Sequence, residues 1–84
     1  MEQYLITFRS VTYAQRGERA LRKRGIGCSL MRTPKWMEEQ GCGYGLRLRG
    51  SAVYRALDAL RSDGVSWRKV YRYSRDGKAE EAAL

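Results

Sequence analysis

The residues of this 84-residue chain best suited to covalent chemistry are its two cysteines, because the sequence contains no histidine. Cys42 stands between Gly41 and Gly43, so neither neighbour has a side chain that could shield its thiol. A cysteine in this setting is either a small residue in a tight turn or a thiol kept accessible for reaction. Cys28 lies in the apolar stretch 26–31, which predicts a buried structural thiol.

The absence of histidine excludes several common kinds of site. Ser-His-Asp triads and Cys-His dyads require an imidazole, and two cysteines alone do not complete a structural zinc site. The sequence shows no cofactor-binding loop and no pair of catalytic carboxylates, so we expect no metal, no cofactor and no autonomous enzyme. A disulfide between Cys28 and Cys42 remains an alternative, and it requires Cα atoms within about 7 Å of each other.

The chain is strongly basic. It has 17 Lys and Arg against 9 Asp and Glu, and its formal net charge is +8. Such a surface attracts polyanions and acidic proteins, although it also keeps a small domain soluble. The basic side chains around Cys42 that we expect at the surface are Arg32, Lys35, Arg47 and Arg49.

The cellular setting follows from the apolar pattern. No apolar run approaches the roughly 18 residues that a membrane-spanning helix needs. The N-terminal stretch has an acidic residue and too short an apolar core for a signal peptide. These features predict a cytoplasmic protein without a membrane segment, whose thiols stay reduced.

Apolar periodicity predicts four strands and two helices. The strands are expected at residues 3–8, 26–31, 44–49 and 65–73, and the helices between Ser10 and Gly25 and between Ser51 and Gly64. The serines are placed to cap the helices and the glycines to end them. The order β-α-β-β-α-β predicts a ferredoxin-like α+β sandwich, an antiparallel sheet of order 4-1-3-2 with both helices on one face. Residues 1–74 would form this single domain, and residues 75–84 a flexible tail.

The third predicted strand separates apolar from basic side chains. Leu46 and Leu48 share one face, and Arg47 and Arg49 share the other. The stretch CGYGLRLR partly matches the strand motif of RNA-recognition domains, but their register would bury both arginines at a high cost in free energy. We therefore expect the leucines to face the helices and the arginines to line the open face. Nucleic acid could still bind there through its phosphates, but this reading is not favoured.

The last predicted strand also alternates. Val65, Trp67, Tyr71 and Tyr73 share one face of it and are expected to be packing residues first. If they face the open side of the sheet instead, they would form a surface for a homodimer beside the arginines.

With these elements in place, residues 4–64 resemble the bacterial selenium/sulfur carrier-like proteins, a family of small domains. The shared features include an opening strand that ends in Thr-Phe and a helix that leads to a Gly-Ile strand start. The specific pieces are Thr33-Pro34 after the second strand and Cys42-Gly43 before the third.

This resemblance implies a role for the exposed cysteine. Cys42 would be the carrier thiol, holding sulfur or selenium as a persulfide or perselenide, in a supporting loop that includes Thr33, Pro34, Gly41 and Gly43. The partners would be a donor, such as a cysteine desulfurase, and an acceptor protein. The alternative is a small basic module that binds nucleic acid or an acidic protein without thiol chemistry. Such a module would tolerate Cys42→Ser and lose affinity as salt rises.

Overall fold

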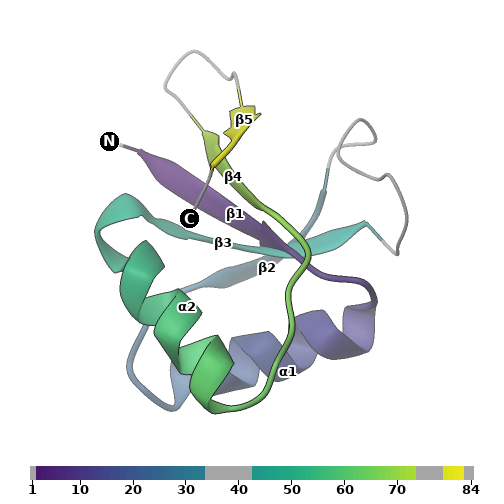
Figure 1. Cartoon of the computed structure of the whole chain (residues 1–84), viewed down its shortest axis with the longest axis vertical. Helices are drawn as coiled ribbons and strands as arrows, with labels where there is room; N and C mark the ends of the chain where they lie inside the picture. The colour runs from purple at the N-terminus through teal and green to yellow at the C-terminus, as the bar shows by residue number, and fades with distance from the viewer. Residues whose placement is uncertain (1, 34–42, 74–78, 83–84) are drawn as a thin grey trace.

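The computed structural model of the chain describes residues 2–33, 43–73 and 79–82 (Figure 1). In chain order its elements are β1 (Gln3–Thr7), α1 (Val11–Arg22), β2 (Ser29–Arg32), β3 (Tyr44–Arg49), the 3-10 turn η2 (Gly50–Ala52), α2 (Val53–Ser62), β4 (Val70–Tyr73) and β5 (Ala79–Glu81). Within these ranges no helix is long and apolar enough to cross a membrane.

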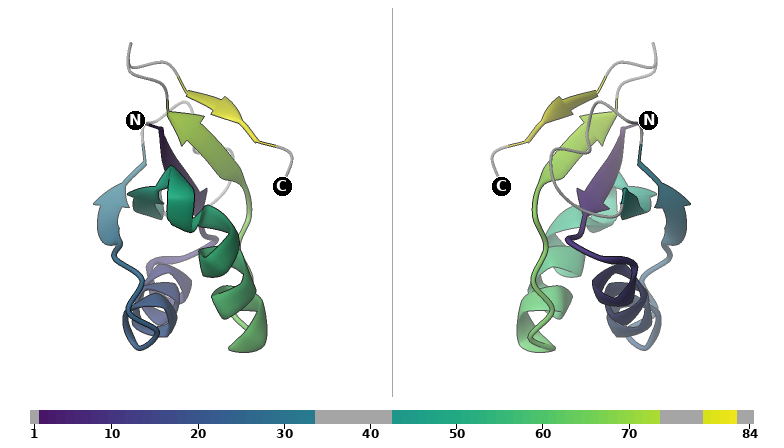
Figure 2. Two further views of the ribbon diagram at one scale, coloured as in Figure 1. Left: turned by 90° about the vertical axis from the view of Figure 1, so that its left-hand side faces the viewer. Right: turned by 90° about the vertical axis from the view of Figure 1, so that its right-hand side faces the viewer.

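The strands form one antiparallel sheet in the order β2-β3-β1-β4-β5. Both helices pack on the same face of this sheet, so the fold has two layers (Figures 1 and 2). The predicted α+β fold, with two helices on an antiparallel sheet, is confirmed. The strand order differs from the four-stranded sheet that we expected, because β5 adds a fifth strand at the edge beside β4.

Strand β5 lies in the segment that the sequence predicted as a flexible tail. Its residues pair with β4, and the backbone N–H of Ala82 donates to the carbonyl oxygen of Val70 across 2.7 Å. Glu80 and Glu81 form ion pairs with basic side chains at β4, Arg72 and Lys69 respectively. Residues 79–82 are therefore part of the sheet. The sequence missed this strand because backbone pairing and charge complementarity stabilise it, without an apolar alternation.

The core lies between the helices and the sheet, as the helical periodicity predicts. Ile6 and Leu46 from the sheet and Leu21 and Leu60 from the helices are fully buried there. The buried helix positions are Ala14, Gly17, Ala20 and Leu21 in α1, and Val53, Ala56, Leu57, Ala59 and Leu60 in α2.

The two helices begin differently. Ser10 caps α1 as predicted, because its hydroxyl accepts a hydrogen bond from the backbone N–H of Tyr13 at 3.3 Å. The predicted cap at Ser51 is wrong. Ser51 lies inside η2, and α2 begins after Ala52 without a side-chain cap. The chain turns directly from β3 into a 3-10 turn, so the cap position moves one residue along the chain.

The predicted register of β3 is confirmed. Leu46 and Leu48 are buried against the helices, and Arg47 and Arg49 are exposed on the opposite face. That face is not bare, however, because a second small cluster is buried in it. The members of this cluster are Leu5 and Tyr71, which are buried, and Met31 and Tyr73, which are half-buried.

Two strands are shorter than predicted, since β2 begins at Ser29 and β4 begins at Val70. The predicted common face for Trp67 and Tyr71 is also wrong, because Trp67 packs on the helix side and Tyr71 on the other. A β-bulge explains the change. Thr7 alone faces two residues, since its carbonyl oxygen accepts from Arg68 N–H at 2.7 Å and its backbone N–H donates to the Lys69 carbonyl at 2.8 Å. The extra residue reverses the alternation before β4.

Candidate functional site

The predicted carrier loop begins after β2 and ends before β3, and the structure describes both ends. The backbone N–H of Thr33 donates to the carbonyl oxygen of Gly43 across 2.6 Å. This bond extends the ladder beyond the Arg32↔Tyr44 pair, and both Thr33 and Gly43 are buried. We call this pair the loop base. Four predicted site residues lie outside the described residues: Pro34, Lys35, Gly41 and Cys42.

Gly43 leads the chain into β3 in a conformation that favours glycine. Its φ is 73°, in the left-handed region where the Cβ of an L-residue comes too close to a carbonyl oxygen. The second position of the Cys42-Gly43 pattern therefore has a backbone requirement of its own. That requirement is independent of any effect of the glycine on access to the thiol.

Two tyrosine rings have arginines stacked on them. At the loop base, the guanidinium carbon of Arg32 lies 5.5 Å from the ring centroid of Tyr44. The second ring is that of Tyr13 on α1, and the guanidinium carbons of Arg9, just before this helix, and Arg16 lie 5.3 and 5.7 Å from its centroid. The structure thus holds Arg32, one of the predicted basic residues, directly beside Thr33 and next to the start of the loop.

Arg47 and Arg49 project from the face of β3 opposite the helices. Neither forms an ion pair within the part of the chain that the structure describes. Arg49 lies six residues after Gly43, which is about 20 Å along a strand. The predicted basic residues are therefore not gathered in one place. Arg32 lies at the loop base, and Arg49 lies at the far end of β3.

Cys28 precedes β2 and is half-buried against the main core, so the prediction of a fully buried strand residue is wrong. Burial raises the pKa of its thiol, an effect that Arg22 opposes and Glu18 reinforces. Cys28 is a free thiol, so it is not paired with Cys42. Residue 29 pairs with Arg47, four residues or about 13 Å along β3 from the loop base.

A hollow of about 510 Å³ opens beside Cys28, and the sequence analysis missed it. Its lining includes Ser29 from the start of β2, Arg47 and Arg49 from β3, and Ser51 from η2. The one signal in the sequence is that glycines precede β2 and follow β3 at this end. These glycines indicate that both strands end there. They do not indicate that the space between the strands is left unfilled by side chains.

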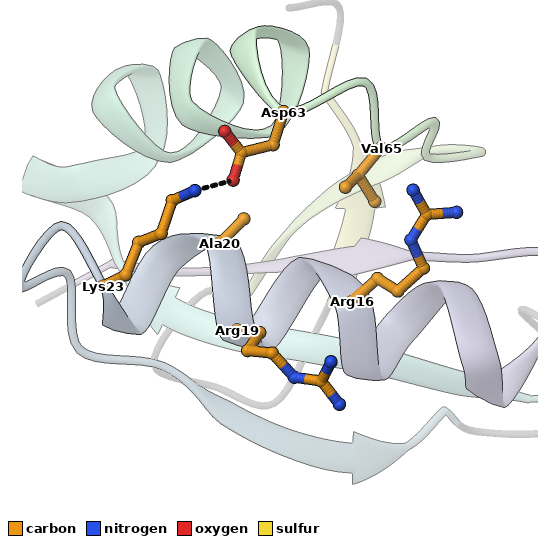
Figure 3. Close-up of a pocket in the computed structure, with 6 residues that line it drawn as sticks. All are labelled: Arg16, Arg19, Ala20, Lys23, Asp63 and Val65. Carbon is orange, nitrogen blue, oxygen red and sulfur yellow. Dashed lines mark ion pairs between the residues drawn. The ribbon is translucent and has the colours of Figure 1, made fainter.

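A second cavity, of about 390 Å³, lies between α1 and the end of α2 (Figure 3). The Asp63 carboxylate forms ion pairs with Arg24 at 3.0 Å and with Lys23 at 2.9 Å. These contacts lower the pKa of Asp63 to about 2. Arg16 and Arg19 also line the cavity, but their guanidinium groups point in different directions (Figure 3). The cavity therefore contains an ion pair that links the two helix ends, and two arginines whose cations point apart.

The described residues contain no group of three or more His, Cys, Asp or Glu side chains that could hold a metal ion. The chemistry available in the described part is thus that of a half-buried thiol and of guanidinium groups. The former is a soft nucleophile once ionised, and the latter bind oxyanions.

The model of the family described as "Putative Se/S carrier protein-like" matches residues 3–72, from β1 to β4. No curated protein matches the chain. The matched range includes the loop base and both cysteines.

Proposed function

Because the chain belongs to the Se/S carrier protein-like family, we propose that it carries sulfur or selenium as a persulfide or perselenide on Cys42. One observation supports this use of the loop most directly. Thr33 and Gly43 are the outer residues of the patterns Thr33-Pro34 and Cys42-Gly43, and they meet in a hydrogen bond of 2.6 Å. The outer residues of the two patterns therefore meet at the loop base, and Cys42 directly precedes Gly43 in the chain.

The proposed reaction is an exchange between thiols. The Cys42 thiolate attacks the outer sulfur of a donor persulfide, a new S–S bond forms, and the donor leaves as its own thiolate. Transfer to an acceptor repeats the step in the other direction, so no external oxidant or reductant is needed. Selenium would move in the same way as the outer atom of a perselenide.

The Arg32 cation next to the loop base favours the thiolate form of Cys42 in this proposal. Arg32 is held beside Thr33 by its contact with the Tyr44 ring, and a nearby cation lowers the pKa of a cysteine. The Cys28 thiol, by contrast, has a raised pKa because of burial. Cys42 is therefore the thiol that we expect to react first at neutral pH.

The partners in this proposal are a sulfur or selenium donor of the cysteine desulfurase type and an acceptor protein, both in the cytoplasm. The excess positive charge would speed encounter with acidic partners. The order β2-β3-β1-β4 of the first four strands supports describing the fold as ferredoxin-like with an added edge strand. A homodimer through the open sheet face stays a prediction.

The test is sulfur loading. The protein is incubated with a cysteine desulfurase and free cysteine, and intact mass and peptide mapping locate the adduct. We expect one added sulfur atom on Cys42, its loss in Cys42→Ser, and its retention in the matched control Cys28→Ser. An adduct that persists in Cys42→Ser, or that maps to Cys28, would contradict the proposal.

A second candidate function is the small basic binding module, for nucleic acid or an acidic protein. The observation that favours it is a set of arginines without ion pairs in the described part of the chain, on both sides of the fold: Arg16 and Arg19 on α1, and Arg47 and Arg49 on β3. Fluorescence anisotropy with a labelled oligonucleotide at rising salt tests it. Binding that falls steeply with salt and is unchanged in Cys42→Ser would favour the module over the carrier.

A further inference from the structure

The hollow beside Cys28 forms where β2 leaves the sheet. The strands β2 and β3 pair from Arg32↔Tyr44 to Ser29↔Arg47, and the pairing stops there. Strand β3 continues for two more residues, to Arg49, without a strand opposite on that side. The space that a longer β2 would fill is instead the hollow of about 510 Å³.

The backbone of β3 presents a free donor to this space. The backbone N–H of Gly50 donates to the carbonyl oxygen of Glu2, just before β1, and in an antiparallel ladder alternate residues bond to opposite neighbours. The odd-numbered residues of β3 therefore direct both their N–H and their C=O groups toward β2, in line with the Gly43 carbonyl oxygen just before β3, which accepts from Thr33 N–H. At Arg49 the opposing strand has ended, and its N–H makes no hydrogen bond within the described part of the chain.

The side chains around this donor are complementary to an anion. Arg47 and Arg49 line the hollow, and each lacks an ion pair among the described residues, although most of the acidic side chains described do form one. Ser29 and Ser51, which carry hydroxyl groups, also line the hollow. Among the residues that the structure describes, none that lines the hollow is acidic. Positive charge, hydroxyl groups and a free backbone N–H together are the usual means of binding an oxyanion.

We propose that this hollow binds a small organic anion through its phosphate or carboxylate group. The charged group would contact Arg47, Arg49 and the free N–H, and the body of the molecule would lie against Leu48, Ala52 and the Cys28 thiol. The volume supports an organic ligand rather than a bare inorganic ion, because small-molecule sites typically begin at about 300 Å³. The site is separate from the loop base and does not depend on the proposed function of Cys42.

Nuclear magnetic resonance tests the proposal directly. Phenyl phosphate is titrated into the full-length, ¹⁵N-labelled chain, and we expect the amide signals of residues 27–29 and 47–52 to shift together. The double variant Arg47→Gln/Arg49→Gln should weaken this binding at least about tenfold, because it removes two charge-assisted contacts. No shift at millimolar phenyl phosphate and millimolar benzoate would overturn the proposal.

A matched double variant separates a local site from general surface charge. Arg16→Gln/Arg19→Gln removes the same charge from two arginines that line the other cavity and that also form no ion pair with a described residue. We expect this variant to weaken phenyl phosphate binding less than about twofold, since its arginines line the other cavity and their charges reach the hollow only through screening solvent. An equal loss in both double variants would overturn the proposal. Melting temperatures of both variants establish that they are folded.

Cys28 provides a second readout at the hollow itself. In the Cys42→Ser protein, bound phenyl phosphate should slow alkylation of Cys28 by iodoacetamide, a neutral reagent. Unchanged alkylation at saturating ligand would place the ligand elsewhere. Because this protein lacks Cys42, a failure of sulfur loading and a failure of anion binding are observed in separate experiments.

Comparing different ligands shows which anionic group the hollow prefers. Benzoate binding more tightly than phenyl phosphate would identify a carboxylate site, and the reverse a phosphate site. Inorganic phosphate should bind more weakly than phenyl phosphate if the apolar lining contributes. An oligonucleotide that binds tightly, and loses affinity equally in both double variants, would identify a diffuse basic surface and overturn the proposal.

Discussion

Replacing Gly43 by alanine should destabilise the fold through the loop base. Gly43 has a φ of 73°, where an L-residue costs about 1–2 kcal/mol relative to glycine. For a domain of this size, each kcal/mol corresponds to about 4–8 °C in melting temperature. We therefore expect Gly43→Ala to melt roughly 5–15 °C below the unchanged protein. Gly43 is also the residue whose carbonyl oxygen accepts the hydrogen bond from Thr33, so the strain acts directly on the loop base.

Two further variants test whether the left-handed backbone conformation of Gly43 is the cause of the lower melting temperature. Gly25 also has a φ of 73°, at the end of α1, and a Cβ there would meet no atom within 4 Å. Gly25→Ala should thus show a similar backbone cost, far from the loop base. Gly43→Asn should lose less stability than Gly43→Ala, because asparagine enters the left-handed region more readily than alanine does.

The assay combines thermal unfolding with the rate of sulfur loading. If the loop base positions Cys42, Gly43→Ala should load more slowly than the unchanged protein at a temperature where both are folded. Gly25→Ala should load at the unchanged rate. A melting temperature for Gly43→Ala within about 1 °C of the unchanged protein would refute the strain argument. Equal loading rates in both alanine variants would refute the positioning role of the base.

Three other variants follow from the packing, the capping and the charges. Gly45→Ala should cost about 1–3 kcal/mol in urea unfolding, because its Cβ would lie 2.8 Å from the backbone oxygen of Ile6. Ser10→Ala should cost about 1 kcal/mol by the same measurement, because it removes the hydrogen bond to Tyr13 N–H. The pKa of Asp63 is lowered from 3.8 to about 2, so its ionised form stabilises the fold above pH 4, and this stabilisation is lost as pH falls toward 2. Asp63→Asn should therefore flatten the pH dependence of the melting temperature in that window.

The elements that local patterns determine were predictable from the sequence. The helical stripe and the cap at Ser10 place α1 correctly, and the alternation of leucine and arginine fixes both the extent and the register of β3. In each case the hydrophobic effect and backbone capping act within the same few residues that show the pattern. A slip of one residue in β3 would bury Arg47 and Arg49, so the register allows no close alternative.

The elements that depend on distant partners were not predictable. The bulge opposite Thr7 reverses the faces of β4, and only the pairing with β1 reveals it. Strand β5 has no apolar alternation, and its glutamates meet their basic partners only once the sheet has formed. The bulge and β5 both depend on pairing and on charges between separate strands. The periodicity of a single segment contains no information about such contacts.

For the candidate site, the sequence brought together residues that the fold separates and missed residues that the fold brings together. Thr33 and Gly43 do meet, as their place in one predicted loop suggests. Arg49 does not join them, because six residues of extended chain separate it from Gly43, about 20 Å along the strand. The hollow beside Cys28 could not be foreseen, because it depends on where β2 stops pairing.

The two ends of the β2–β3 pair thus offer different settings for a thiol. At one end the ladder closes with the loop base, and Cys42 directly precedes Gly43 of this base in the chain. At the other end the ladder stops early, and Cys28 borders a cationic hollow while burial raises its pKa. A raised pKa leaves little thiolate at neutral pH, so Cys28 is suited to contact a bound ligand rather than to attack a persulfide. If sulfur transfer takes place on this domain, the reactive thiol should therefore be Cys42, and Cys28 should stay reduced and unmodified during loading.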